Sequence, residues 1–399
     1  MSQRKGMKRV WIKEPLAIYE ATDAAGGLVI EGDTIIELIG KNQEPSRQVD
    51  QIFDASSLVV LPGLINTHHH FYQNLSRSFS KALNQPLFNW LENLYPLWAK
   101  LNIEDISISS RLALTELLLS GCTTTVDHHY LFSNELQNAI DVQVSEASDL
   151  GLRATLCRGS MSLSIEDGGL PPTSVVQDEK TILEDSERLI KNYHNPDQGS
   201  KLQIALAPCS PFSVTRELMQ ASAELASTHK VKIHTHLGET EDETKFCIDQ
   251  YGVKPLDYLD EMNMLSNEIW IAHGIHFDAD EIIRLGNAKV GVSHCPSSNM
   301  ILSSGICPVF DLEKAGAKVG IGVDGSSSND SSNMIEELRM AMLLQRLKSG
   351  AQKISHLDAI RWATRGSAAC IGRSDLSLIH ISEPTRPRLM SYAVFCLKK

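Results

Sequence analysis

Short apolar segments alternate with helical patterns eight times between Leu58 and Asp324, and this alternation constrains the fold more than any other feature. The helical stretches, such as IEDISISSRLALTELLLSG, carry apolar residues at i, i+3 and i+4 spacing. The apolar segments are bounded by Gly, Pro, Ser or charge and read LVVLPGLINTH, TTTVDHH, LRATLCRGS, LQIALAPCSP, VKIHTHLGE, IWIAHGIH, KVGVSHCPSS and KVGIGVDGSS. Eight strand–helix repeats predict an α/β protein with a (β/α)8 TIM barrel. An open doubly wound sheet is the alternative, but no glycine-rich phosphate turn follows the first strand.

The segment ahead of the barrel predicts a second, smaller domain. Residues 1–60 contain β-like pieces separated by turn signals, for example GLVIEGDTIIELIG. We expect them to form the N-terminal part of a small β-sheet (sandwich) domain, followed by the barrel over residues 61–373.

Composition excludes several classes of partner. The net charge of −12 argues against a nucleic-acid polymer or an anionic membrane surface. No apolar stretch approaches the length of a membrane span. Eight cysteines are scattered without a CxxC pair, which predicts free thiols and a cytoplasmic location.

Histidine collects at the C-terminal ends of the predicted strands. In a barrel these ends converge on one face, where such enzymes place their chemistry. Half of the fourteen histidines belong to four of these ends, namely His68, His70, His128, His129, His234, His236 and His273. This convergence predicts a metal site.

Four residues are the predicted metal ligands: His68, His70, His236 and Asp324. A catalytic zinc ion needs a few nitrogen or oxygen ligands and an open position for water. No lysine ends the fourth strand, LQIALAPCSP, so a bridging carbamylated lysine has no candidate, which favours one ion over two. The imidazole-rich shell favours Zn²⁺, although Fe²⁺ or Mn²⁺ would fit similar ligands. We expect His69 and His234 to face away from the ion, as structural residues or hydrogen-bond partners.

A set of motifs then resembles a known family. PGLINTHHH, HTHLGET, AHGIH, HCPSSN and GVDGSSSND are, in this order, similar to the amidohydrolase superfamily in its branch of purine and triazine deaminases, over residues 25 to 375. The segments NTHHHFYQ and RGSMSLSIEDGGLPPTSVVQ resemble 8-oxoguanine deaminases and also hydroxydechloroatrazine ethylaminohydrolases. The resemblance implies hydrolytic deamination of 8-oxoguanine to urate and ammonia, with another purine or a triazine as the alternative. Relatives often form dimers, so the resemblance allows a homodimer, and the sequence itself leaves the oligomeric state open.

The resemblance also implies catalytic roles for three residues. Asp324 would take a proton from the attacking water, and Glu239 would protonate the adjacent ring nitrogen and the leaving amine. His273 would hydrogen-bond the attacking oxygen as charge develops. The competing interpretations are that Glu239 only caps the helix at ETEDETKF and that His273 is a buried structural histidine. A barrel that binds metal or ligand without turnover is a further alternative, against which the presence of all three residues weighs.

Substrate contacts are predicted for Gln73, whose amide can pair with a purine edge, and for Arg158, whose guanidinium suits a ring carbonyl. Trp90 is the predicted stacking residue. It lies in the insert QPLFNWLENLYPLWAKL, which we interpret as a helix on the barrel rim or a lid over the site.

The C-terminus departs from the family. Relatives continue after GSAACIGRSD with a segment that returns to the small sheet, whereas residues 374–399 here resemble a translated sequencing adapter. We interpret them as an artefact, and we expect the C-terminal part of the small domain to be missing.

Overall fold

The computed structural model describes residues 8–376 and 395–398, which fall into two compact units. The smaller unit comprises the chain up to Leu64, residues 197–199 and the residues from Arg373 onward. The larger unit comprises residues 65–196 and 200–372. The boundaries expected at residues 60 and 373 stay predictions. Within the described part of the chain, no helix has the length and apolar character needed to cross a membrane.

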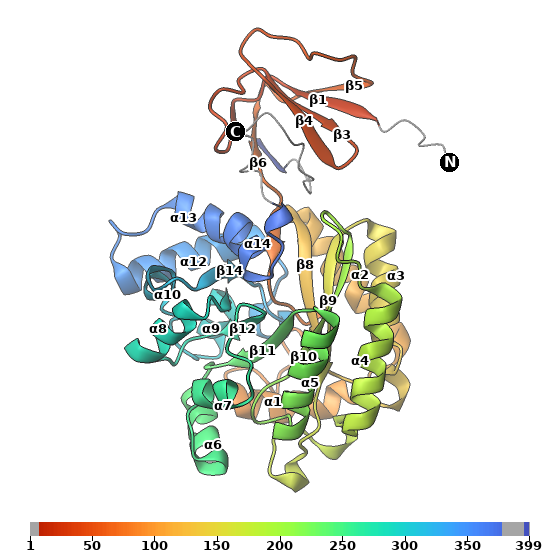
Figure 1. Ribbon diagram of the computed structural model, residues 1–399, viewed down its shortest axis with the longest axis vertical. Helices are drawn as coiled ribbons and strands as arrows, with labels where there is room; N and C mark the ends of the chain where they lie inside the picture. Colours follow the sequence, from red (N-terminus) through yellow and green to blue (C-terminus); the bar gives the residue numbers. More distant parts are fainter. Residues whose placement is uncertain (1–7, 377–394, 399) are drawn as a thin grey trace. The chain divides into compact units, whose positions relative to one another are not determined.

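A closed barrel of eight parallel strands forms the centre of the larger unit and confirms the predicted fold (Figure 1). The strand order around the barrel is β10-β11-β12-β13-β14-β7-β8-β9, so the last strand in sequence pairs with the first. The strands are β7 (Leu64–Asn66), β8 (Cys122–His129), β9 (Arg153–Ser160), β10 (Leu202–Pro208), β11 (Ile233–Leu237), β12 (Ile269–His273), β13 (Gly291–His294) and β14 (Lys318–Ile321).

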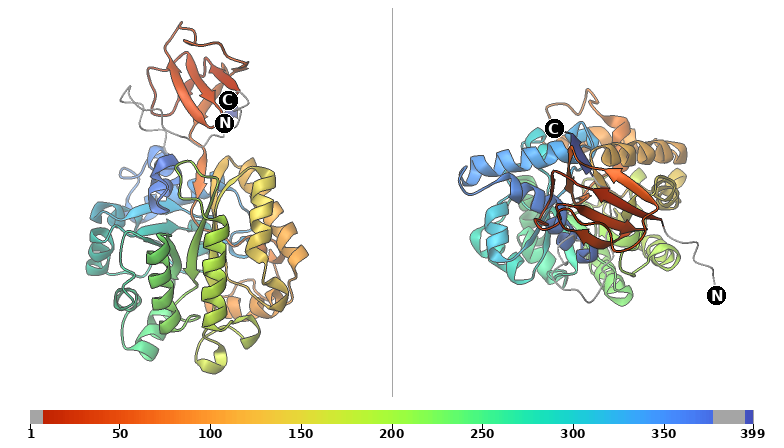
Figure 2. Two further views of the ribbon diagram at one scale, coloured as in Figure 1. Left: turned by 45° about the vertical axis from the view of Figure 1, so that its right-hand side comes forward. Right: turned by 90° about the horizontal axis from the view of Figure 1, so that it is seen from above.

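Helices surround the barrel strands, as the two views of Figure 2 show. Every residue of β8 and β9 is buried, because one face of each strand points into the barrel and the other packs under the helices. The helices are α1 (Leu87–Trp98), α2 (Ile103–Leu119), α3 (Ala139–Leu150), α4 (Glu179–Tyr193), α5 (Arg216–His229), α6 (Glu241–Tyr251), α7 (Pro255–Glu261), α8 (Ala279–Asn287), α9 (Pro296–Ile301), α10 (Val309–Ala315), α11 (Ser326–Asn329), α12 (Met334–Ser349), α13 (His356–Arg361) and α14 (Ser367–Cys370).

The first predicted strand, LVVLPGLINTH, is two strands in the structure. β6 (Leu58–Leu61) belongs to the smaller unit, and β7 begins the barrel after Pro62 and Gly63. Proline has no N–H to donate to a strand ladder, so the pairing is interrupted there and each half pairs with a different sheet.

Two sheets make up the smaller unit. One has the order β4-β3-β1-β5 and the other β15-β6-β2. These strands are β1 (Arg9–Lys13), β2 (Ala17–Ile18), β3 (Gly27–Glu31), β4 (Thr34–Ile39), β5 (Gln51–Asp54) and β15 (Phe395–Lys398). The C-terminal segment therefore supplies one strand, β15, antiparallel to β6, where we expected no such contribution. Residues 377–394 and 399 of the predicted foreign tail lie outside the described residues.

Closure of the barrel places the beginning and the end of its sequence side by side. The Thr67 N–H donates to the Ile321 carbonyl at 2.9 Å, and the Asp324 N–H donates to the His68 carbonyl at 3.0 Å. The Ile321 N–H is held by Ser367 Oγ at 3.0 Å. Two segments more than 250 residues apart thus share backbone hydrogen bonds at the strand ends that carry the predicted ligands.

Replacing Ile321 by alanine tests the importance of this junction. Ile321 is fully buried, and we expect Ile321→Ala to lower the free energy of unfolding by about 2–5 kcal/mol, because it leaves a cavity where β14 meets β7. Urea denaturation of the purified protein measures the change. Leu119→Ala is the control, because Leu119 is 77% exposed and its loss should change stability by less than about 0.5 kcal/mol.

Candidate metal centre and active site

The structure brings the four predicted ligands together. His68 and His70 follow β7, His236 lies on β11, and Asp324 follows β14. The Asp324 Oδ1 atom lies 3.3 Å from His68 Nε2 and 3.5 Å from His70 Nε2. His70 Nε2 lies 3.2 Å from His236 Nε2. All four side chains are buried.

The His68 ring donates its Nδ1 proton to a neighbouring histidine, His234. His234 Nδ1 lies 2.9 Å from the Trp270 carbonyl, which can only accept, so this nitrogen carries the proton of the neutral ring. His234 Nε2 is then an acceptor for His68 Nδ1, at 2.7 Å. His68 Nε2 is left with a free lone pair, and it is buried without a hydrogen bond among the described residues. His234 is therefore the partner that orients the His68 ring.

Backbone carbonyls orient the other two ligand rings in the same way. His70 Nδ1 donates to the carbonyl of His128 at 2.6 Å, and His236 Nδ1 donates to the carbonyl of Cys209 at 2.8 Å. Burial lowers the pKa of His70 to about 3 and holds that of His236 well below its ordinary value, so both rings are neutral. Each therefore presents an unprotonated Nε2 atom.

The convergence of these lone pairs fits a cation. Two unprotonated nitrogens at 3.2 Å cannot share a hydrogen bond, and the Asp324 oxygen adds negative charge beside them. A tetrahedral zinc ion with bonds of about 2.0–2.1 Å would separate its ligand atoms by about 3.3–3.4 Å. The separations of 3.2, 3.3 and 3.5 Å match that spacing. Burial alone would raise the pKa of Asp324, but the neighbouring imidazoles outweigh it and hold the pKa well below its usual range.

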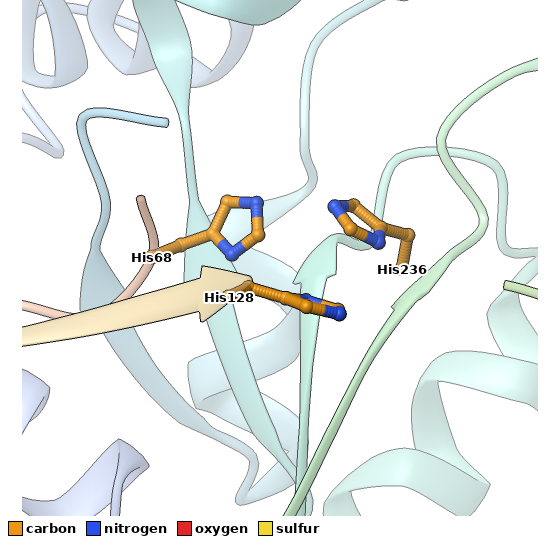
Figure 3. A group of neighbouring side chains, drawn as sticks. All are labelled: His68, His128 and His236. Atoms are coloured by element: carbon orange, nitrogen blue, oxygen red, sulfur yellow. The ribbon is translucent and has the colours of Figure 1, made fainter. Parts of the chain in front are cut away.

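His128 also lies against this group, although it is not a predicted ligand. Figure 3 shows the rings of His68, His128 and His236 turned toward a common space, and one nitrogen of each lies within 4.8 Å of the others. The His128 ring stacks on His236 with 4.8 Å between centroids. Its Nε2 donates to the Ala207 carbonyl at 3.0 Å, so only Nδ1 keeps a lone pair. A different group of close side chains, His68, His70 and Asp324, includes a carboxylate, whereas the group of three histidines in Figure 3 does not.

Glu239 and His273 lie beside the predicted ligands. His273 Nε2 is 3.4 Å from Glu239 Oε2 and 3.9 Å from Asp324 Oδ2, and its Nδ1 is hydrogen-bonded to Asn299 Oδ1 at 3.0 Å. Burial raises the pKa of Glu239 to about 7, although His273 pulls it down. The carboxyl group therefore carries a proton in a large fraction of molecules near neutral pH.

The alternative role of Glu239 as a helix cap does not hold. Helix α6 is capped by Thr240, whose Oγ1 accepts the Glu243 N–H at 3.3 Å. The Glu239 side chain instead faces the pocket described next.

A pocket opens over this group and includes two of the three predicted substrate contacts. Gln73 and Trp90 line it, and its other lining residues are His70, Leu87, Leu91, Tyr95, Tyr130, Cys209, Phe212, His236, Glu239, His273, Leu302, Asp324 and Ser328. Helix α1 supplies four of them, so the predicted insert forms a wall of the pocket. Gln73 Oε1 is buried without a hydrogen bond among the described residues. Gly325 lacks the Cβ that would lie 1.9 Å from that oxygen, so only glycine leaves room for the amide.

Arg158 does not reach the pocket. Its guanidinium group is buried at 3.0 Å from Asp185 and 2.9 Å from Gln177, and it stacks over the ring of Phe132 at 3.8 Å. His129 donates to the Leu131 carbonyl. Neither residue is among those that line the pocket, so we assign Arg158 no substrate contact.

Sequence reasoning missed several lining residues. Tyr130 directly follows the histidines of β8, and its position after a strand end was a usable signal. Cys209, which follows β10, also lines the pocket beside His236. Tyr95 lies in the insert predicted to cover the barrel rim, although it was not singled out there. Phe212 and Leu302 lie in segments whose position over the barrel mouth has no local signature.

Comparisons with known proteins agree with this geometry. Residues 59–380 match the Amidohydrolase family. The chain is 58% identical, over 93% of its own length and 83% of the relative's, to an 8-oxoguanine deaminase of Pseudomonas aeruginosa. It is 35% identical to a hydroxydechloroatrazine ethylaminohydrolase of Pseudomonas sp. strain ADP, over 86% of this chain and 72% of that one.

A solved structure has a similar fold. The atrazine chlorohydrolase of Arthrobacter aurescens TC1 complexed with zinc matches with a TM-score of 0.87 and 29% identity, over 98% of this chain and 87% of that chain. The family resemblance predicted from the motifs is confirmed.

Removing His234 should weaken metal retention. Because His234 fixes the proton of His68 on Nδ1, we expect His234→Ala to lower the affinity for a divalent ion about 10- to 100-fold. The measurement is metal content by mass spectrometry after dialysis against graded chelator. His294→Ala is the matched control, a buried barrel histidine whose Nε2 lies 3.4 Å from Gln345. Equal metal retention by the two variants would contradict the assignment.

Proposed function

This chain belongs to the amidohydrolase family, and from that membership we propose that it is a metal-dependent aminohydrolase that converts 8-oxoguanine and water to urate and ammonia. The observation that carries the proposal is the convergence of three unprotonated nitrogens and a carboxylate beside a protonatable, buried Glu239. The 58% identity to a protein named 8-oxoguanine deaminase supports the choice of substrate.

We assign His68, His70, His236 and Asp324 as the ligands of one divalent ion. Zinc suits three imidazoles and a carboxylate in tetrahedral geometry, and Fe²⁺ or Mn²⁺ would accept the same donors. When bound, such an ion would lower the pKa of water toward neutrality and would make a hydroxide nucleophile available at physiological pH.

The remaining steps fall to the side chains of this protein. Asp324 uses its Oδ2, on the side of His273, to accept the proton of the attacking water. The oxygen adds to the ring carbon that bears the amino group, and Glu239 gives its proton to the adjacent ring nitrogen. His273, 3.4 Å from Glu239, stabilises the oxygen as charge develops on it. The proton that Asp324 took from the water then passes through Glu239 to the amino group, and the C–N bond breaks to release ammonia. The added hydroxyl becomes a carbonyl as its proton returns to Glu239, so both carboxyl groups regain their starting states.

The pocket favours a flat, uncharged substrate. Trp90 and Phe212 provide aromatic surface for a purine ring, and the free Gln73 Oε1 can accept a ring N–H. Among the described residues that line the pocket, none is lysine or arginine, so a phosphate group would lose its hydration without a counter-charge. A free base is therefore the proposed substrate rather than a nucleotide.

Two alternatives stay testable. A triazine aminohydrolase is supported by the 35% identical relative named for that activity. A barrel that binds metal without turnover is disfavoured, because such a site has no use for Glu239 and His273 beside the ligands. We also propose a cytoplasmic homodimer.

A substrate panel tests the function directly. We expect ammonia release from 8-oxoguanine with stoichiometric urate, and much lower kcat/KM with guanine, isoguanine, hydroxyatrazine and an 8-oxoguanine nucleotide. Removal of the ion with a chelator should abolish activity, and added Zn²⁺ should restore it. A higher kcat/KM with hydroxyatrazine would favour the triazine alternative, and no turnover of any compound would overturn the proposal.

Replacing Gln73 tests the substrate contact. We expect Gln73→Ala to lower kcat/KM on 8-oxoguanine about 10- to 100-fold, because one buried hydrogen bond to the ring is lost. Gln177→Ala is the control, since Gln177 binds Arg158 outside the pocket, and its kcat/KM should stay within about twofold. An unchanged Gln73→Ala enzyme would remove Gln73 from the substrate site.

A further inference from the structure

The turn that carries Glu239 is fixed to the end of β12. The carbonyl of Gly238 accepts the N–H groups of Ile275 and His276 at 2.7 and 2.9 Å. Gly238 has a φ of +65°, and a Cβ there would lie 2.7 Å from the Phe277 ring. The backbone that presents Glu239 is therefore packed against the segment that follows His273.

A buried glutamate holds the other side of the same turn. Glu243 lies in the first turn of α6 and has no exposed surface. Its Oε1 accepts the Gly238 N–H at 3.1 Å, and its Oε2 accepts the Glu239 N–H at 2.8 Å. Both carboxylate oxygens are thus used on two consecutive backbone amides, one of which belongs to the proposed general acid.

Helix α8 shows what a glutamate in this position normally does. Its N-cap Asp278 and the third helical residue, Glu281, form a capping box, in which Glu281 Oε2 accepts the Asp278 N–H at 2.8 Å. Glu243 has the same spacing from its N-cap, Thr240. Its carboxylate nevertheless passes over the N-cap amide and binds the two residues before it. A helix cap alone does not require hydrogen bonds to the two residues that precede the N-cap.

We propose that Glu243 is a positioning residue for Glu239, which acts by fixing the peptide planes on both sides of Gly238 and so the direction of the Glu239 side chain. The inference rests on the proposed function, in which Glu239 transfers protons. Two backbone anchors, one from Glu243 and one from Ile275 and His276, leave the Glu239 carboxyl 3.4 Å from His273 Nε2. A displacement of about 1 Å at such a group can reduce the rate about 100-fold.

The test compares Glu243→Gln with Glu281→Gln. A glutamine amide has one acceptor oxygen, so in E243Q one of the two backbone N–H groups faces an NH₂ donor. We expect kcat to fall about 10- to 100-fold, with KM within about threefold and metal content unchanged. E281Q makes the same carboxyl-to-amide change at the same helical position and should lower thermal stability to a similar degree, while kcat stays within about twofold. A wild-type kcat for folded E243Q would overturn the inference.

A double-mutant cycle shows whether the effect passes through Glu239. In the Glu239→Gln background, E243Q should lower the residual kcat by less than about threefold, because the proton that Glu243 helps to place is already absent. If E243Q lowered kcat by the same factor in the Glu239→Gln background as in the wild-type enzyme, the inference would be overturned.

A second variant keeps the inference testable if E243Q does not fold. Glu243→Asp keeps the charge but is one methylene too short to reach both amides, so its kcat should also fall, and a wild-type kcat would overturn the inference. Failure of the proposed function is distinguishable, because the wild-type protein itself would then release no ammonia.

Discussion

Barrel closure between β14 and β7 is the constraint on which the site depends. The Thr67 N–H binds the Ile321 carbonyl, and the Asp324 N–H binds the His68 carbonyl at 3.0 Å. These bonds join the first and last strands, so an aspartate and a histidine that are distant in sequence become neighbours. The distance of 3.3 Å between Asp324 Oδ1 and His68 Nε2 therefore depends on barrel closure.

Backbone carbonyls then decide which nitrogen of each imidazole is available. A neutral imidazole ring carries one N–H proton. When a carbonyl accepts a hydrogen bond from Nδ1–H, the Nε2 atom has no proton and keeps a free lone pair. The carbonyls of His128 and Cys209 do this for His70 and His236, and the carbonyl of Trp270 does it for His68 through His234. The acceptors belong to strands β8 and β12 and to the residue after β10, so the fold itself sets the tautomers that a metal ion requires.

The pKa values of two carboxyl groups in one pocket are shifted in opposite directions. The imidazoles around Asp324 hold its pKa well below its usual range, although burial opposes them. Burial dominates at Glu239 and raises its pKa to about 7. Such a separation supports the proposal that the base and the acid of the proton-transfer mechanism are different residues. The turn that carries Glu239 is held by Glu243 and by the segment after His273. The backbone therefore sets the spacing between Glu239 and His273, the two groups proposed to be catalytic.

The sequence by itself determined the repeat of strands and helices, and with it the barrel and the strand ends where His68, His70, His236 and Asp324 come together. It could do so because the C-terminal ends of parallel strands always meet on one face, so that periodicity and position suffice. Other features were decided only in three dimensions. Arg158 also ends a strand, but Asp185 and Gln177 from other segments turn its side chain away from the pocket. The segment 58–68 has one apolar pattern, yet tertiary pairing divides it between two sheets at Pro62. The contacts of Glu243 could not be predicted from the sequence, because its spacing is that of a helix cap and only the packed turn shows which amides it binds.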